Sequence, residues 1–179
     1  MRGQHGRGDP EIAFRPLPTN TDSLGYDRFV HVAAGQQHTC LVGEKTPGNP
    51  NQDPFQEVVC AGGNEFGQMG REESSGVQPR FLPIGPILRG NNQTVMNRPI
   101  TKLDSWGNHT CLLRETMRPE NALACWGGNR FQQAQPGSEN MMARPRIISL
   151  FGEDQVDDVA VGRDHTCAKT ANEVKCWGN

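Results

Sequence analysis

The chain has 179 residues, of which 34% are hydrophobic and 6% aromatic, and it contains 21 glycines and 13 prolines. This composition is lean for a helical core and is typical of many short strands joined by turns. The formal net charge of −2 argues against a strong non-specific attraction to nucleic acid or to acidic membranes. No run of 18 apolar residues is present, so the sequence predicts no membrane span, and residues 1–10 lack the apolar centre of a signal peptide.

A polar segment at residues 1–28 is followed by a pattern of three sequence words. The first word is an alternating apolar run, FVHVAAG, from Phe29; the second is QQHTCLV, from Gln36; the third is CAGGNEFGQMG, from Cys60. Apolar residues that recur at every second position are typical of a strand, and a cluster of glycine and asparagine ends a strand in a turn. We therefore expect strands near residues 30–34, 38–42 and 58–61.

Two further copies keep the words in the same order. The second copy reads ITKLDSWG, GNHTCLL and CWGGNRFQQAQ, and the third reads VDDVAVG, RDHTCAK and CWGN. Four aligned words in one order, counting the connecting words PRFLPI and PRIISL, indicate a repeat protein with units of about fifty residues, a period typical of propeller blades.

The repeat sets the expected organisation of the chain. The words PRFLPI, from Pro79, and PRIISL, from Pro145, are interpreted as linkers. Cys40, Cys111 and Cys167 lie 71 and 56 positions apart, which indicates an insertion at Leu88–Asn97 in the first unit. We expect repeat one with its linker at residues 29–99, repeat two with its linker at 100–155, and a truncated repeat three at 156–179. The segment 1–28 resembles the end of a preceding repeat.

Gly-x-x-His-Thr followed by Trp-Gly-x-Asn-x-Phe-Gly-Gln-x-Gly resembles the repeat of the regulator of chromosome condensation family. The resemblance covers roughly Phe29 to Asn179 and implies an all-β fold, a partial or open β-propeller of about three blades. Ala61 departs from the pattern where Trp126 and Trp177 follow it, and the second copy has FQQAQ in place of Phe-Gly-Gln-x-Gly. The paired cysteines resemble those of secreted bacterial repeats and of crinkly-type receptor-kinase ectodomains.

The six cysteines form one pair in each copy. Their intervals of 20, 14 and 9 positions are what neighbouring strands of a hairpin give when only the connecting loop changes length. We therefore predict local disulfides, which join Cys40 to Cys60, Cys111 to Cys125 and Cys167 to Cys176. A zinc site that uses His38 with the first pair is the rival, although no fourth ligand recurs in all units. Reduced, buried thiols are a third possibility.

Two further residue types recur with the repeat. His38, His109 and His165 are predicted to be buried imidazoles that bond to backbone, because no Ser, Asp or Glu recurs beside them as a catalytic partner. Trp126 and Trp177 follow the second cysteine directly, so each points to the opposite face from the disulfide and is predicted to lie in the core. No catalytic, metal or cofactor site is predicted.

Function in a propeller is carried by loops, so the leading hypothesis is a non-enzymatic module that binds a protein partner through blade loops. Leu41–Val59 and Leu88–Asn97 are the candidate contact segments. The six cysteines favour an extracellular or other oxidising compartment. The resemblance adds two alternatives: a guanine-nucleotide exchange factor for a small GTPase, and an enzyme inhibitor or receptor ectodomain. No nucleic-acid partner is predicted.

Overall fold

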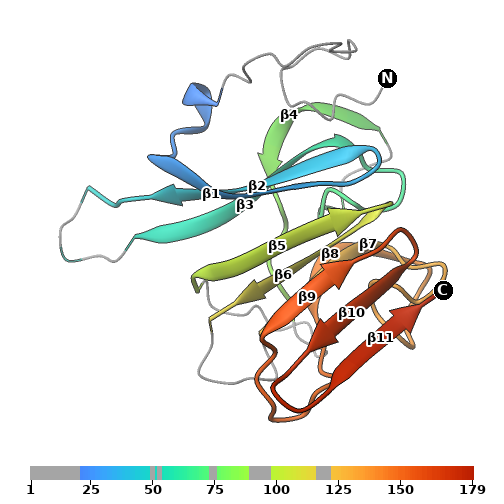
Figure 1. The fold of residues 1–179 in the computed structure, drawn as a ribbon. Helices are drawn as coiled ribbons and strands as arrows, with labels where there is room; N and C mark the ends of the chain where they lie inside the picture. Colours follow the sequence, from blue (N-terminus) through green and yellow to red (C-terminus); the bar gives the residue numbers. More distant parts are fainter. Residues whose placement is uncertain (1–20, 49–50, 52–53, 73–75, 89–97, 116–121) are drawn as a thin grey trace.

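The computed structural model describes residues 21–48, 51, 54–72, 76–88, 98–115 and 122–179. Within these residues the chain forms three antiparallel sheets of four, four and three strands, with one short 3-10 helix, η1 (Asp22–Leu24) (Figure 1). The all-β prediction is therefore confirmed. A search of the described residues for an apolar helix of membrane-spanning length finds none.

Each sheet is a meander in which consecutive strands pair along the chain. Sheet 1 consists of β1 (Arg28–Ala34), β2 (His38–Lys45), β3 (Phe55–Gly63) and β4 (Val77–Pro83). Sheet 2 consists of β5 (Ile100–Trp106), β6 (His109–Arg114), β7 (Leu123–Gly128) and β8 (Met141–Ile147). Sheet 3 consists of β9 (Asp158–Val161), β10 (His165–Lys169) and β11 (Val174–Gly178).

The words interpreted as linkers contribute the outer strands β4 and β8, so that interpretation is wrong for most of their residues. The prolines in these words are compatible with a strand because a missing N–H is tolerated at a sheet edge. In β8 the outer edge is also covered: Leu88 donates its N–H to the carbonyl of Pro145 at 2.9 Å, and Ile147 donates to the carbonyl of Leu88 at 2.9 Å. Leu88 itself is buried.

The prediction of a long first loop at Leu41–Val59 is wrong at both ends of this segment. The ladder between β2 and β3 continues from Cys40–Cys60 through Val42–Val58 to Lys45–Phe55. Both ends of the expected loop are therefore paired backbone, and the connection between the strands is shorter than the sequence suggests. The remainder of the second expected contact segment, residues 89–97, lies outside the described residues.

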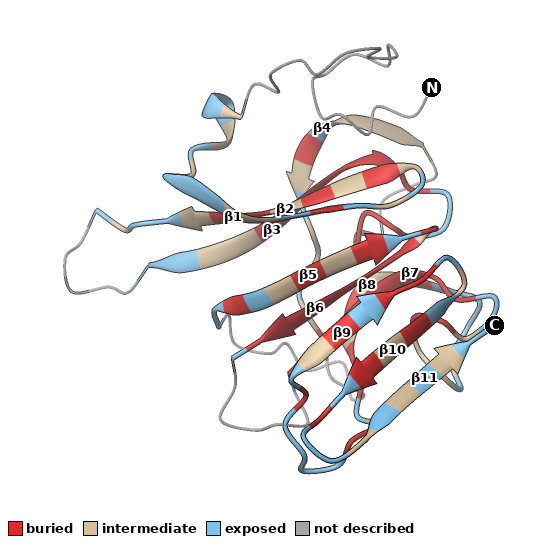
Figure 2. Ribbon diagram, in the orientation of Figure 1, coloured by how far each residue is buried: buried red, intermediate tan, exposed pale blue. Residues whose placement is uncertain are grey.

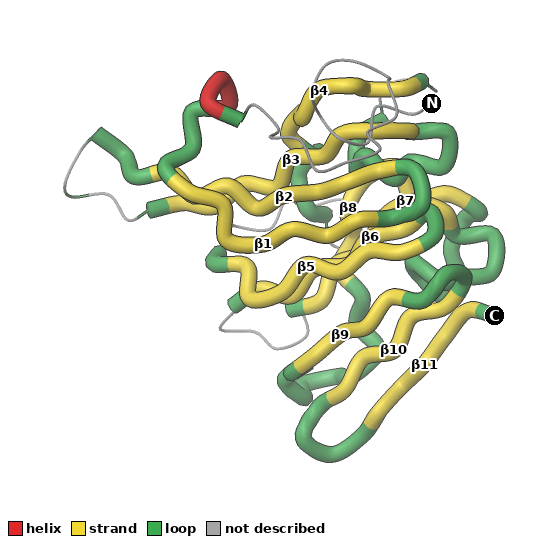
Figure 3. Tube along the Cα trace, turned by 45° about the horizontal axis from the view of Figure 1, so that its top comes forward, coloured by secondary structure: helices red, strands yellow, loops and turns green. Residues whose placement is uncertain are grey.

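The sheets stack in chain order, with their first strands side by side. Strand β1 contacts β5, and β5 contacts β9 (Figures 1 and 3). Side chains alternate across a strand, so each sheet has a front face, which carries its disulfide, and a back face, which carries Trp126 in sheet 2 and Trp177 in sheet 3. The front face of one sheet packs against the back face of the next.

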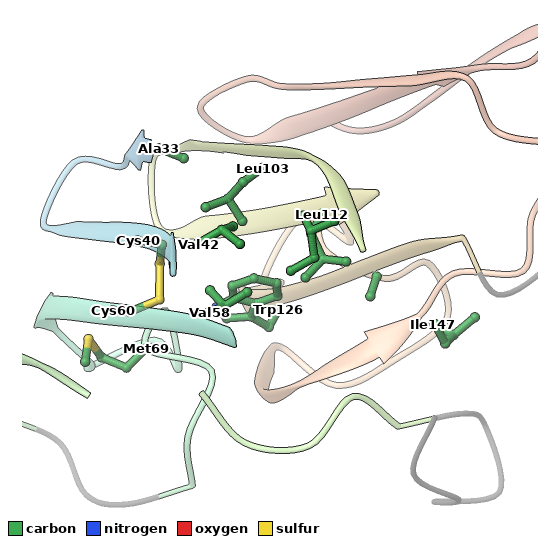
Figure 4. Packing of buried hydrophobic residues seen from close by; sticks show 12 residues of the cluster. Ala33, Cys40, Val42, Val58, Cys60, Met69, Leu103, Leu112, Trp126 and Ile147 are labelled. Carbon is green, nitrogen blue, oxygen red and sulfur yellow. A yellow bond between two sulfur atoms is a disulfide. The ribbon is translucent and has the colours of Figure 1, made fainter. Parts of the chain in front are cut away.

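We call the two contacts between consecutive sheets the 1–2 joint and the 2–3 joint. In the 1–2 joint, Cys40, Val42 and Val58 of sheet 1 pack against Leu112 and Trp126 of sheet 2 (Figure 4). The 2–3 joint repeats this arrangement with Cys111, Leu113, Leu123 and Cys125 against Val159, Val161, Ala168 and Trp177. Two joints built from equivalent positions explain why the same words recur along the chain.

One glycine of the third word is required by the hairpin itself. Gly62 and Gly127 have φ angles of 121° and 104°, in the region that L side chains rarely adopt. A Cβ on Gly62 would lie 2.3 Å from the carbonyl oxygen of Gln37, and a Cβ on Gly127 would lie 2.3 Å from that of Asn108. The glycine therefore lets the turn before the second strand rest on the third strand.

Candidate interaction surfaces

The structure contains three disulfides, Cys40–Cys60, Cys111–Cys125 and Cys167–Cys176, and no cysteine is free. Each pair occupies directly opposed positions of a hairpin, with Cα atoms 4.0 to 4.1 Å apart. Because the bridge spans adjacent strands, the loop between its cysteines changes length without moving it. Among the described residues no group of three or more His, Cys, Asp or Glu could hold a metal ion.

In the 1–2 joint, a buried histidine connects the sheets through hydroxyl groups. His38 Nε2 lies 2.7 Å from Thr110 Oγ1 and 2.9 Å from Ser105 Oγ, and the two hydroxyl oxygens lie 2.6 Å apart. The imidazole stacks over Gly35, where a Cβ would come within 2.1 Å of the ring. The expected bond to backbone is thus replaced by a bond to the next sheet.

The 2–3 joint repeats this bond. His109 Nε2 lies 2.8 Å from Thr166 Oγ1, and the Thr166 hydroxyl donates to the carbonyl of Gln133 at 2.8 Å. Because the hydroxyl proton is used on Gln133, the imidazole must donate from Nε2, which leaves Nδ1 unprotonated. Nδ1 is buried and has no partner among the described residues. In sheet 2 the His-Thr-Cys motif therefore has three roles: His109 donates to the next sheet, Thr110 bonds to the histidine of the previous sheet, and Cys111 forms the disulfide within its own sheet.

Burial shifts the titration of both joint histidines. Desolvation, with a smaller contribution from His109, lowers the pKa of His38 from 6.5 to about 4. Desolvation, with a smaller contribution from His165, lowers the pKa of His109 to about 4 as well. Both imidazoles are thus neutral at physiological pH, because burial disfavours the charged form.

His165 departs from the expectation of a buried core histidine. Its side chain is exposed, although it stacks over Gly162 as His38 stacks over Gly35. The physical reason is that no sheet among the described residues covers the front face of sheet 3. The disulfide shows the same difference: Cys111 and Cys125 are fully buried, whereas Cys167 is half-buried and Cys176 is exposed.

The tryptophans also differ between the sheets. Trp126 is fully buried in the 1–2 joint (Figure 4). Its Nε1–H donates to the carbonyl of Gln68 at 3.0 Å. Trp177 is half-buried against the 2–3 joint, and its Nε1 has no partner among the described residues. Ala61, at the equivalent position of sheet 1, is buried in a small cluster that Leu24 and Tyr26 cover.

Sequence reasoning missed the side chains that shape the loops after β3 and β7. Asn64 Oδ1 accepts from the N–H of Met69 at 3.0 Å, and Asn129 Oδ1 accepts from Ala134 and Gln135 at 2.9 and 2.8 Å. Gln68 and Gln133 each accept from the N–H two residues earlier. The signal was present in the sequence, because both residue types recur at the same offset after the second cysteine.

These loops and the first hairpin turns share one end of the sheets, which we call the turn end: residues 35–37, 64–72, 106–108, 129–140 and 162–164. It carries three exposed aromatic side chains, Trp106 at 57%, Phe66 at 42% and Phe131 at 41% exposure. An exposed aromatic side chain can contribute strongly to an interface, because it buries a large apolar area when a partner covers it. The turn end is therefore the first candidate interaction surface.

Backbone contacts hold the turn end together across the sheets. Gln36 donates to the carbonyl of Gly107 at 2.8 Å, and Gly107 lies so close to Arg163 that a Cβ would come within 2.2 Å of its carbonyl oxygen. Phe66 extends from sheet 1 to the neighbourhood of Gly128 in sheet 2. Trp106 thus stands on a turn fixed on both sides.

The opposite end of the 1–2 joint has a cavity of about 490 Å³. Arg28, Glu44, Phe55, Arg98 and Glu115 are among its lining residues. Its main ion pair joins Arg28 Nε to Glu44 Oε1 at 2.6 Å, and this hydrogen bond lowers the pKa of the Glu44 carboxyl. With charges of both signs, the cavity has no single ligand chemistry, and we regard it as secondary to the turn end.

Comparison with curated proteins finds relatives that contain repeats. The chain is 28% identical to the ultraviolet-B receptor UVR8 of Arabidopsis thaliana over 177 residues, covering 98% of this chain and 35% of that protein. It is 26% identical to the human probable E3 ubiquitin-protein ligase HERC4 over 156 residues, covering 86% of this chain and 12% of that protein. The chain thus spans only a part of these relatives. No family model matches it.

Solved structures show the same fold. The crystal structure of human WBSCR16 superposes with a TM-score of 0.68 at 19% identity, covering 98% of this chain and 40% of that one. Yeast RCC1 (Prp20), in its crystal structure with Kap60, gives a TM-score of 0.53 at 16% identity, covering 84% of this chain and 43% of that one. The chain therefore carries repeats of the regulator of chromosome condensation type, and its three sheets are blades of an RCC1-like β-propeller.

Proposed function

We propose that this chain is a non-enzymatic protein-binding module whose turn end contacts the partner. The observation that carries the proposal is Trp106, the most exposed aromatic side chain of the described residues, held on a turn between two neighbouring sheets. Tryptophan and arginine dominate the binding energy of protein interfaces when they are covered. A rigid turn also reduces the entropy lost on binding, because the contact side chains are already positioned.

Neighbouring side chains at the turn end suit the same role. The Arg130 guanidinium lies 5.8 Å from the centre of the Phe131 ring in a cation–π arrangement, and both residues are exposed. The Arg163 side chain is 72% exposed and lies 3.6 Å from Asp164. Exposed aromatic and arginine side chains on one rigid end favour a partner that is itself a folded protein surface or peptide.

Yeast RCC1, which shares the fold, has been crystallised bound to Kap60, so a protein that contains this architecture can bind another protein. The exchange-factor, inhibitor and receptor-ectodomain alternatives rest on the resemblance alone, because no described residue favours one of them. We place the module in an oxidising compartment, because three disulfides persist where thiols are not kept reduced.

The test places a photo-crosslinking amino acid at position 131, which lies at the turn end and leaves Trp106 in place, in the protein in its native cells. The proposal expects a discrete crosslinked product that excess wild-type protein suppresses and excess Trp106→Ala protein does not. Crosslinking from position 55, at the opposite end of the sheets, is the matched control. Trp106→Ala should change the free energy of unfolding by less than about 0.5 kcal/mol, because the side chain is exposed. Equal suppression by both competitors would contradict the proposal.

A further inference from the structure

The disulfide of sheet 3 differs from the other two in its access to solvent. The four cysteines of sheets 1 and 2 are fully buried, whereas Cys167 is half-buried and Cys176 is exposed. In Figure 2 β10 and β11 alternate in burial from one residue to the next, whereas β6 and β7 are buried along their length. An exposed disulfide exchanges with thiols more readily than a buried one. The side chains around this bridge therefore decide which thiols react with it.

A hollow of about 150 Å³ lies beside the bridge, and its lining includes Cys167, Ala160 and Val174. Cys167 pairs with Ala160 on β9 and with Cys176 on β11, so Ala160 lies on the side of Cys167 that is opposite to Cys176. Ala160 is exposed and has a small side chain. A thiolate attacks a disulfide in line with the S–S bond. A sulfur atom that enters the hollow past Ala160 therefore approaches Cys167 from the side that exchange requires.

One charged residue at the hollow has no counterpart in the other sheets. Lys169 also lines the hollow and stands opposite Val174, at the position that Val42 and Leu113 occupy in sheets 1 and 2. Its side chain is exposed and forms no ion pair with the described residues. An ammonium group is retained here where the equivalent positions are apolar, so this face of sheet 3 is suited to an anionic group in solvent.

The neighbouring carboxylate does not neutralise this corner. Asp158 lies opposite Lys169 on β9, but its carboxylate accepts a hydrogen bond from Lys102 Nζ. The pKa of the Asp158 carboxyl is lowered, chiefly by this hydrogen bond and to a smaller extent by the charge of Lys169. Two ammonium groups thus face one carboxylate, and the end of the hollow beside Lys169 keeps a net positive charge.

We infer that the Cys167–Cys176 bridge is a thiol-exchange site for a small thiol that carries a carboxylate, which Lys169 holds while the thiol sulfur attacks Cys167. The size of the hollow suits a small molecule, and the unpaired ammonium group selects its charge. Because β11 pairs only with β10 among the described strands, exchange makes the attachment of this strand depend on the thiol. The inference is independent of the turn-end proposal, since this face lies on the strands of sheet 3 and not on the turns.

The exchange consists of two substitutions at sulfur. In the first, the ligand thiolate forms a bond to Cys167 Sγ, and the electron pair of the broken S–S bond leaves on Cys176 Sγ, which becomes a solvated thiolate. In the second, another ligand thiolate attacks the ligand sulfur of the mixed disulfide and releases the ligand as its own disulfide, with Cys167 left as a thiolate. The bridge has then gained two electrons, both supplied by the two ligand thiols. Lys169, two residues along β10, stabilises the Cys167 thiolate.

The test uses the whole chain with two small thiols, 3-mercaptopropionate, which is anionic, and 2-mercaptoethanol, which is neutral. The rate constant of each with Cys167–Cys176 is measured at low salt and equal thiolate concentration, by rapid alkylation and non-reducing peptide mapping. The ratio of the two rate constants should fall about threefold to fivefold in Lys169→Gln, because an exposed ion pair contributes at this level. Lys45→Gln removes the same charge from an exposed position of sheet 1 and should leave the ratio unchanged.

Peptide mapping also identifies the sulfur that is attacked. The ligand should be found on Cys167, and the alkylating reagent on Cys176. Ala160→Leu, a change at an exposed position that fills the hollow, should slow the formation of the Cys167 adduct with both thiols.

Three results would overturn the inference. In one, the ratio of rate constants is the same in the wild type, in Lys169→Gln and in Lys45→Gln, so that the bridge reacts through its exposure alone. In another, the ligand attaches mainly to Cys176. In the third, neither cysteine of sheet 3 forms an adduct.

Discussion

Sheets 2 and 3 contain the same sequence motifs but differ in how many of their faces a neighbouring sheet covers. In sheet 2 both faces are covered, so Trp126, His109 and the Cys111–Cys125 disulfide are fully or almost fully buried. In sheet 3 only the back face is covered, and the equivalent Trp177, His165 and Cys167–Cys176 are half-buried or exposed. The strand register is nevertheless the same, from Cys111 opposite Cys125 to Cys167 opposite Cys176. The repeat therefore specifies the hairpin, and the neighbouring sheet determines how much each residue contributes to stability.

The largest expected effect is that of the buried indole. Trp126→Ala should lower the free energy of unfolding by about 3–5 kcal/mol, because it leaves a cavity in the 1–2 joint. Trp177→Ala should cost clearly less, since its indole is half-buried and its Nε1 has no partner among the described residues. Denaturant titration of both variants measures the difference. Equal losses would show that the two sheets are equally supported.

The second largest effect expected is the loss of unfolding free energy at low pH, to which the buried histidines contribute. A histidine with a folded pKa near 4 and an unfolded pKa near 6.5 stabilises the fold fully above pH 6.5, and this stabilisation is lost as the pH falls toward 4. His38 and His109 should each contribute about 3 kcal/mol to this loss. His109→Gln should flatten the dependence of unfolding free energy on pH in that window. His165→Gln is the comparison and should change the slope less than His109→Gln, because it removes only the smaller contribution of His165 to the lowered pKa of His109.

Reduction of the disulfides tests the same difference between sheets 2 and 3, because a reductant reaches an exposed bridge more readily than a buried one. A limiting amount of reductant should open Cys167–Cys176 before the two buried bridges, because Cys176 is exposed. Opening this bridge, whose cysteines are nine residues apart, should lower stability by about 2.5 kcal/mol on the chain-entropy estimate. Alkylation followed by non-reducing peptide mapping gives the order. Earlier opening of Cys40–Cys60 would mean that the 1–2 joint opens more readily than its burial indicates.

The smallest effect expected is that of a single hydroxyl group. Thr166→Val removes the acceptor of His109 and the donor to Gln133, and leaves both buried groups unpaired. The expected cost is about 1–3 kcal/mol of unfolding free energy. Thr39→Val is the matched control, because Thr39 occupies the same place in sheet 1 without a histidine from a preceding sheet among the described residues. Its cost should stay within about 0.5 kcal/mol.

The hairpins were predictable from the sequence because the three copies of the repeat can be compared with one another. The intervals between Cys40 and Cys60, Cys111 and Cys125, and Cys167 and Cys176 change while the flanking words do not. Only a bridge between neighbouring strands tolerates that change. The outer strands were missed because their prolines read as breaks, and a short sequence pattern does not distinguish an edge strand from a linker.

The partners of the histidines could not be predicted for a different reason. His38 bonds to Thr110, which lies 72 positions further along the chain and belongs to the next copy of the same word. A repeat pattern shows that both residues recur, but it does not show that the histidine of one copy contacts the threonine of the next copy. The exposure of His165 was missed for the same reason, because burial depends on two sheets and the pattern describes only one.

The backbone conformation of Gln132 was not predicted either. Its φ of 65° is close to that of Gly67, the equivalent residue of the first copy, although Gln132 has a side chain.

The stacking order also determines how the molecule can come apart. The substantial contacts between sheets join β1 to β5, β2 to β5, β5 to β9 and β6 to β9, and all of these link consecutive sheets. Such an array has nearest-neighbour coupling, so its cooperativity is transmitted from one unit to the next and not through a single shared core. Fraying then begins at sheets 1 and 3, which each have one neighbouring sheet among the described residues, and sheet 3 has one strand fewer than sheet 1. Amide hydrogens of β10 and β11 should therefore exchange with solvent through sub-global openings that leave β6 and β7 intact.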